Sequence, residues 1–267
     1  MNIWTDICVN LTNQRFASDQ EAVIERAINN GVQRMLIVGT DITSSHAAIE
    51  LCHRYPDHMR ATVGCHPHDA KTMDEKAWQQ LEDLLASPMV VAVGECGLDF
   101  NRNFSEPATQ LEVFARQMAL ASDKDLPVFL HERDACIEML SILSQYPKPK
   151  KVIHCFTGSE EQAQGYLELD CYIGVTGWVT DERRNQDLVS AIEIIPNERL
   201  LIETDAPYLL PKNIAPKPKS GRCEPCHLPY VSEKIAELRN TNHDVLVAVT
   251  TLNSIKLFNW PVAESLL

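Results

Sequence analysis

The chain has 267 residues, with 24 Lys or Arg and 37 Asp or Glu, so its formal net charge at pH 7 is −13. This acidic balance argues against a general binder of duplex DNA, which needs a broad basic face. Hydrophobic residues make up 45% and charged residues 23% of the sequence, proportions that are ordinary for a globular enzyme.

Residues 1–14 have neither a basic start nor a long apolar run, so we expect no signal peptide. No apolar run approaches the roughly 18 residues of a transmembrane helix, and we expect no membrane partner. The nine cysteines are scattered, and most lie in apolar, strand-like runs where reduced buried thiols are common. These features predict a cytoplasmic protein.

Patterns typical of strands and of helices alternate along the whole chain. The expected strands are residues 3–11, 32–40, 59–67, 90–100, 127–132, 151–156, 172–177 and 199–207. The expected helices are a first one starting near the capping-box pair Ser18 and Glu21, then 44–55, 73–87, 106–125, 134–146, one from 159, 183–195, 229–239 and 242–258.

Eight strands, each followed by a helix, predict a (β/α)8 TIM-type barrel that forms a single domain over residues 1–267. The alternative is an open, doubly wound parallel sheet. The sequence has neither GxGxxG nor GxxxxGK[ST], and this absence weakens the nucleotide-binding version of that alternative.

Four apolar runs end in residues that bind metals or transfer protons. Glu95 ends the run VVAVGE, His131 follows PVFL, His154 follows KVI, and Asp205 closes RLLIETD. A buried carboxylate is costly unless a charged group meets it, and the carboxyl ends of barrel strands converge on one face. Two imidazoles and a carboxylate suit Zn²⁺, Mn²⁺ or a partly hydrated Mg²⁺. We therefore predict a metal site formed by Glu95, His131 and His154.

Five motifs in register resemble the TatD family of metal-dependent deoxyribonucleases, which belong to the amidohydrolase-like barrels. The resemblance covers essentially the whole chain. The motifs are GCHPHD (64–69), GECGLDF (94–100), PVFLHERDA (127–135), HCFTG (154–158) and ETDAPYL (203–209).

The resemblance implies that Glu95, His131 and His154 hold one divalent metal and that Glu95 can bridge to a second. We expect Mg²⁺, with Mn²⁺ and Zn²⁺ as alternatives. Asp205 would bind metal, activate the attacking water, or both. His66 would donate to phosphate or transfer a proton. The implied substrates are the 3′ ends of single-stranded DNA or RNA, cleaved in the 3′-to-5′ direction by a monomeric enzyme.

Two other functions remain open on the same scaffold, because a fold does not determine a substrate. One is a deacylase or esterase, such as an enzyme that acts on mischarged aminoacyl-tRNA. The other is a binding module that lost its activity together with one metal site.

Five further side chains have weaker assignments. Glu203 would orient a ligand or a water molecule. Arg133 would contact phosphate in a bidentate manner or form a salt bridge at a helix start. His68 is interpreted as loop structure or as part of the site. Arg183 and Arg184 are weaker candidates for phosphate contact and are interpreted mainly as a solvated helix end.

One departure from the family pattern concerns the first strand. Most members carry D-x-H-x-H there, whereas this chain has Asp6-Ile7-Cys8-Val9-Asn10. The match is closest to the branch of the family that lacks the histidine pair. The Cys8 thiol and the Asn10 amide oxygen, which take the place of the two histidines, are poor ligands for Mg²⁺. We therefore expect a weak first metal position that the oxygens of a bound phosphate complete.

Residues 207–230 are rich in Pro and Lys, and we expect them to wrap one side of the active-site face. Within them, RCEPCHLP (222–229) resembles the family's R-N-E-P stretch, with Cys223 in place of Asn. The string C-x-x-C-H also matches a c-type haem attachment, a redox pair or half a zinc site. Because no export signal is visible, we expect neither haem nor a disulfide. Glu224 would then orient a ligand or contact substrate.

Overall fold

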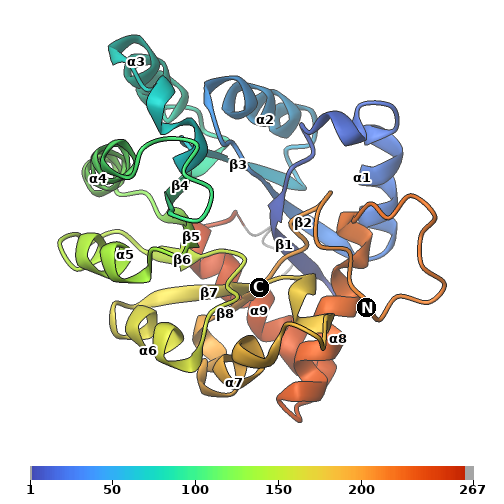
Figure 1. The fold of residues 1–267 in the computed structure, drawn as a ribbon. Helices are drawn as coiled ribbons and strands as arrows, with labels where there is room; N and C mark the ends of the chain where they lie inside the picture. Colours follow the sequence, from blue (N-terminus) through green and yellow to red (C-terminus); the bar gives the residue numbers. More distant parts are fainter. Residues whose placement is uncertain (1, 262–267) are drawn as a thin grey trace.

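The computed structural model describes residues 2–261, in which eight parallel strands pair in the order β1 to β8. Figure 1 shows the helices arranged around the outside of these strands. The strands are β1 Trp4–Val9, β2 Val32–Ile37, β3 Met59–Val63, β4 Val90–Asp99, β5 Val128–Arg133, β6 Lys151–Ile153, β7 Cys171–Val175 and β8 Leu200–Ile202.

A short contact between the first and last strands closes the barrel. Val9 forms a parallel bridge with Ala206. The backbone N–H of Asp205 donates to the carbonyl of Cys8 at 3.0 Å, and the N–H of Asn10 donates to the carbonyl of Ala206 at 2.8 Å. The predicted barrel is therefore confirmed, and the open doubly wound sheet is wrong.

The strand–helix alternation is confirmed in every repeat. The α-helices are α1 Gln20–Asn29, α2 Ile42–Arg54, α3 Glu75–Leu84, α4 Pro107–Lys124, α5 Cys136–Leu143, α6 Glu160–Glu168, α7 Gln186–Ile194, α8 Leu228–Leu238 and α9 His243–Phe258. Short 3-10 helices precede several of them, including η3 Gly177–Thr180 and η5 Pro225–His227. Among residues 2–261, no helix combines the length and the apolar character that crossing a membrane requires.

Two local predictions are wrong. The expected capping box at Ser18 and Glu21 does not form, because the N-cap of α1 is Asp19 and its carboxylate instead pairs with Arg26 and Arg222. The last strand was expected to continue to residue 207, but β8 ends at Ile202. Beyond it the regular strand pairing is interrupted before the single bridge at Ala206, and Asp205 adopts a φ of 54°. Its side chain is therefore placed by a turn and not by strand alternation.

Apolar side chains fill the barrel interior below its carboxyl end. One cluster joins a side chain from seven strands to the end of α9, namely Ile7, Leu36, Ala92, Phe129, Val152, Tyr172, Leu201, Leu257, Phe258 and Trp260. A larger cluster packs the outer faces of the strands against the helices. Because the interior is packed in this way, a ligand can be received beyond the carboxyl ends of the strands and not inside the barrel.

Candidate active site

A cavity of about 870 Å³ lies at the carboxyl ends of the strands. Each of the eight strands, or the segment that follows it, contributes a residue to the lining of this cavity. In strand order these residues are Asn10, Thr40, His66, Glu95, His131, His154, Trp178 and Asp205. The predicted site residues Glu95, His131, His154, Asp205, His66 and Arg133 all lie in this lining.

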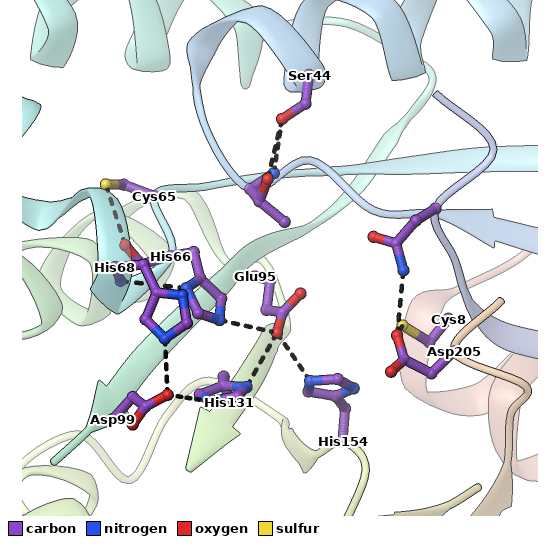
Figure 2. Close-up of polar contacts among 12 residues, drawn as sticks. Cys8, Ser44, Cys65, His66, His68, Glu95, Asp99, His131, His154 and Asp205 are labelled. Carbon is purple, nitrogen blue, oxygen red and sulfur yellow. Dashed lines mark hydrogen bonds and ion pairs between the residues drawn. The ribbon is translucent and has the colours of Figure 1, made fainter. Parts of the chain in front are cut away.

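Three histidines converge on one oxygen of Glu95, as Figure 2 shows. The Oε1 atom of Glu95 lies 2.8 Å from His154 Nε2, 3.2 Å from His131 Nδ1 and 3.4 Å from His66 Nε2. Glu95 is only 6% exposed, and His154 is 5% exposed. The structure thus places His66 beside the predicted trio of Glu95, His131 and His154.

The backbone around Glu95 requires glycine. Gly94 has a φ of 130°, a conformation that L side chains rarely adopt, and a Cβ on it would collide with the carbonyl oxygen of Phe129 in β5. This close approach keeps β4 against β5 at the point where Glu95 enters the cavity.

Charge compensation keeps Glu95 ionised. Burial alone would raise the pKa of Glu95, but the charges of His154 and His66 and the hydrogen bonds from His131 and His154 hold this pKa well below its ordinary value. Burial would lower the pKa of His154, but the carboxylates of Glu95 and Glu203 raise it well above the ordinary value. Burial lowers the pKa of His66. His66 is therefore the imidazole of this group that more readily stays neutral.

Asp99 is a site residue that the sequence interpretation missed. Its Oδ2 atom lies 2.7 Å from His68 Nε2 and 3.5 Å from His131 Nε2. Its Oδ1 atom accepts hydrogen bonds from the backbone N–H groups of Asn101 and Arg102. Asp99 thus connects His68 to His131 and fixes the ring that faces Glu95. The spacing of four residues from Glu95 along β4 was the available signal, because residues i and i+4 share a strand face.

Asp205 lies on the opposite side of the cavity, next to the residues that replace the histidine pair (Figure 2). Its Oδ1 atom accepts from Asn10 Nδ2 at 3.1 Å and from the Cys8 thiol at 3.6 Å. Burial raises the pKa of Asp205 to about 7; His154 opposes this rise, whereas Glu95 and Glu203 add to it. A carboxylate with this pKa can exchange a proton near neutral pH.

Two buried carboxylates support the turn that carries Asp205. Asp6 accepts hydrogen bonds from the Thr204 backbone at 2.9 Å and from its hydroxyl at 2.6 Å, and burial raises the pKa of Asp6 to about 8. Glu203 accepts from the backbone N–H of Cys155 and lies 3.7 Å from His154 Nδ1. Asp6 occupies the first position of the family motif in β1, and the sequence pattern indicates no role for it.

The donor set fits a divalent metal. Three imidazole nitrogens crowd one carboxylate oxygen, which has only two lone pairs to offer to donors. Among residues 2–261, the buried atoms His154 Nδ1 and Glu203 Oε2 have no hydrogen-bond partner, and neither does His131 Nε2, whose approach to Asp99 lacks hydrogen-bond geometry. Two groups of side chains each bring their ligand atoms within 4.8 Å of one another. One group is His66, Glu95 and His131, and the other is Cys8, His154 and Glu203.

The weaker candidates fall into two groups. Arg133 is exposed and lines the cavity, and within the described part of the chain no carboxylate pairs with it. The helix-start salt bridge that was its alternative is therefore absent from residues 2–261. Arg183 and Arg184 precede α7 and both bind the buried carboxylate of Asp181, at 2.9 Å. Phosphate contact by Arg133 stays a prediction.

Glu224 lies outside the cavity lining, in an ion-pair network. Its carboxylate contacts Arg26 Nε at 2.8 Å and Arg222 Nη2 at 2.8 Å, and Arg222 also pairs with Asp19. The neighbouring Cys223 is fully buried, and its thiol faces the Glu224 carbonyl, whereas the Cys226 thiol faces the Glu224 carboxylate. Both thiols are free. The segment therefore connects α1 to the loop after β8.

This fold and this donor set define an amidohydrolase-like barrel enzyme. A family model described as TatD related DNase matches residues 5–259. The chain therefore belongs to the TatD family of DNases.

Named relatives and a solved structure agree with this assignment. The Edwardsiella piscicida protein named 3′-5′ ssDNA/RNA exonuclease TatD is 49% identical over 255 residues, which are 95% of this chain and 98% of that protein. The protein of the same name from Erwinia tasmaniensis is 47% identical over 256 residues, covering 95% and 99%. The crystal structure of YJJV, a TatD homologue from Escherichia coli K12, has a TM-score of 0.88 at 29% identity and covers 97% and 98%.

Proposed function

We propose that this protein is a metal-dependent exonuclease that removes nucleotides from the 3′ ends of single-stranded DNA and RNA. The observation that carries the proposal is the convergence of His66, His131 and His154 on Glu95, with Asp205 facing them across one cavity. Relatives that match almost the full chain are named as exonucleases of this polarity. Their names favour nuclease activity over the deacylase alternative.

Glu95, His131 and His154 would hold a divalent cation, with Mg²⁺ as the expected ion and Mn²⁺ or Zn²⁺ as alternatives. When bound, such an ion polarises a phosphoryl oxygen and lowers the pKa of a coordinated water. Asp99 would keep the His131 ring in its orientation. Carboxylates that orient metal-binding histidines commonly affect metal affinity by about 10- to 100-fold.

The remaining residues have separate tasks in phosphodiester hydrolysis. Asp205 would accept the proton of the attacking water, and its pKa of about 7 suits that role. His66, whose pKa is lowered by burial, would donate a hydrogen bond to a phosphate oxygen. The unpaired guanidinium of Arg133 would offset charge on the phosphate in the transition state.

Aromatic side chains at the cavity rim favour an unpaired strand. Phe104 is 52% exposed and Tyr208 is 47% exposed, and both line the cavity together with Trp178. They come from the loops after β4, β8 and β7 respectively. Exposed aromatic rings stack on the faces of unpaired bases with little sequence preference. Bases in a duplex do not offer these faces.

The test compares two labels on the same single strand. We expect a 3′ label to be released as mononucleotide at once, whereas a 5′-labelled strand shortens stepwise, and chelation of metal stops both. An ester substrate assayed in parallel tests the deacylase. Hydrolysis of the ester without release of the 3′ label would overturn the proposal. The cytoplasmic location and monomeric state remain predictions, which cell fractionation and sedimentation test.

A further inference from the structure

A second cavity, of about 490 Å³, lies beside the active-site cavity and is lined mainly by charged side chains. Three segments form it: the end of η3 with the residues before α7, the loop after β8, and α8. The charged residues in its lining are Asp181, Glu182, Arg183, Lys212, Lys217 and Lys234. Four cations thus face two carboxylates in a chain whose net charge is −13.

The negative charge in this cavity is already engaged by protein cations. Asp181 is buried, and its carboxylate binds Arg183 through two hydrogen bonds of 2.9 and 3.0 Å and Arg184 at 2.9 Å. Lys234 pairs with Glu237 at 3.0 Å and lies 3.7 Å from Glu182.

Lys212 and Lys217 are exposed, and neither forms an ion pair within residues 2–261. These two ammonium groups are therefore available to an anionic ligand.

The cavity adjoins the active site through two short pieces of chain. Trp178 lines the active-site cavity, whereas Thr180, two residues later, lines the second one. In the loop after β8, Leu209 lines the active-site cavity and Lys212, three residues later, lines the second cavity. The backbone N–H of Lys212 donates to the Thr180 hydroxyl at 2.7 Å, which ties the two pieces together. Two or three residues span at most about 7–11 Å, a distance that a few nucleotides cover.

We propose that this second cavity binds the phosphodiester backbone of the substrate strand, on the 5′ side of the nucleotide that is being removed. The inference rests on the proposed exonuclease function. A strand whose 3′ end lies in the active-site cavity would cross the ridge at Trp178, where a base can stack on the ring. Its next phosphates would then meet Lys212 and Lys217. The Arg184 guanidinium lies over the Trp178 ring, 4.2 Å from its centroid, and helps to hold the ring in place.

The test is the double substitution Lys212→Glu/Lys217→Glu, compared with Lys76→Glu/Lys124→Glu. The control pair changes the net charge equally, and its residues lie on α3 and α4, across the barrel from α7 and α8 in Figure 1. For a strand of about 12 nucleotides, a length within the range of single-strand sites, we expect the first pair to raise KM by about 10-fold and to leave kcat unchanged. For a dinucleotide, which does not reach the second cavity, we expect no change. The control pair should alter neither.

A binding measurement decides the inference independently of turnover. The probe is a fluorescent strand with a cleavage-resistant 3′-phosphorothioate end, titrated at several salt concentrations. Losing two phosphate contacts should reduce the slope of log K against log salt by about 1.4. The milder variant Lys212→Gln/Lys217→Gln should show the same direction of change. Thermal melting checks that each variant is folded.

Equal KM values and salt slopes for the two pairs would overturn the inference while leaving the exonuclease proposal intact. Loss of inhibition by a nucleoside monophosphate, with the strand KM unchanged, would also overturn it and assign a product site instead. If the wild-type protein releases no 3′ label, the proposed function fails, and the salt slope alone then decides whether the cavity binds a strand.

Discussion

The two sides of the active-site cavity are built from different kinds of side chain. On the side of β3 to β6, three imidazoles surround one oxygen of Glu95 within 3.4 Å. On the side of β8 and β1, the side-chain donors to the Asp205 carboxylate within residues 2–261 are an amide and a thiol, from Asn10 and Cys8. The first side holds the ligands that we predict for a tight metal site, whereas the second offers one carboxylate and two poor ligands for Mg²⁺.

Because their ligands differ, we expect metal binding on the two sides of the cavity to depend on metal concentration in different ways. Ligands held in place by neighbouring charged groups, as His131 is between Glu95 and Asp99, lose little freedom when a cation binds. On the other side a cation would need oxygens from outside the protein, and a substrate phosphate supplies them. We therefore expect one metal to survive purification and a second to bind only with substrate present.

The largest effect is expected from His154→Ala, which removes one of the three predicted ligands. Metal content should fall from about one equivalent to nearly none, and exonuclease activity should drop by about 1,000-fold or more, because the several kcal/mol supplied by the metal are lost. Elemental analysis and the 3′-label assay measure both. His46→Ala, whose side chain is 63% exposed on α2, is the matched control. Wild-type metal content in His154→Ala would refute the trio.

Asp205→Asn tests the other side of the cavity. Turnover should fall by about 100- to 1,000-fold, because the proposed general base is removed. The tighter metal should remain at about one equivalent, since none of its three predicted ligands has changed. A fully active Asp205→Asn protein would show that the base is misassigned. Loss of the metal in this variant would instead place Asp205 among its ligands.

Restoring the histidine pair should reduce the difference between the two sides. In Cys8→His/Asn10→His, the Mg²⁺ or Mn²⁺ concentration that gives half-maximal activity should fall by about 10- to 100-fold. The wild-type protein should need metal in clear excess over one equivalent. Because Cys8 is fully buried, thermal melting must first show that the variant folds. Saturation of the wild-type rate at a single equivalent would contradict the weak second position.

The smallest effect is expected at Glu224, the residue whose predicted contact with substrate remains untested. Burial would raise the pKa of Glu224, but hydrogen bonds and charges from Arg26 and Arg222 lower it below its ordinary value. This ionised carboxylate therefore stabilises the fold above the unfolded pKa of about 4.3, and the contribution disappears as the pH falls through the lower folded pKa.

Glu224→Gln should accordingly lower the free energy of unfolding by about 1–3 kcal/mol at pH 7, and this difference should shrink below about pH 4. Denaturant unfolding across this pH range measures it, with the exposed Glu25→Gln on α1 as the control. The KM of the folded variant should be unchanged. A raised KM without loss of stability would assign Glu224 to substrate binding after all.

The local pattern of the sequence was sufficient for the barrel and for most of the site lining. Apolar runs of period two and helices of period 3.6 record local burial, and their strict alternation leaves few topologies. Glu95, His131, His154 and Asp205 could be placed near the carboxyl ends of strands for the same reason. The exact strand ends could not be placed, as β8 shows, because hydrogen bonds to neighbouring strands decide them.

Tertiary structure decided how these residues meet. The bridge of Val9 in β1 to Ala206 after β8 joins residues almost 200 positions apart and brings Asn10 to Asp205. Asp99 became a site residue only because β5 places His131 beside it. Glu224, which the motif suggests as a functional residue, is held by its neighbour Arg222 and by Arg26 from a distant segment. Such contacts depend on closure of the whole chain, and no local pattern of residues encodes them.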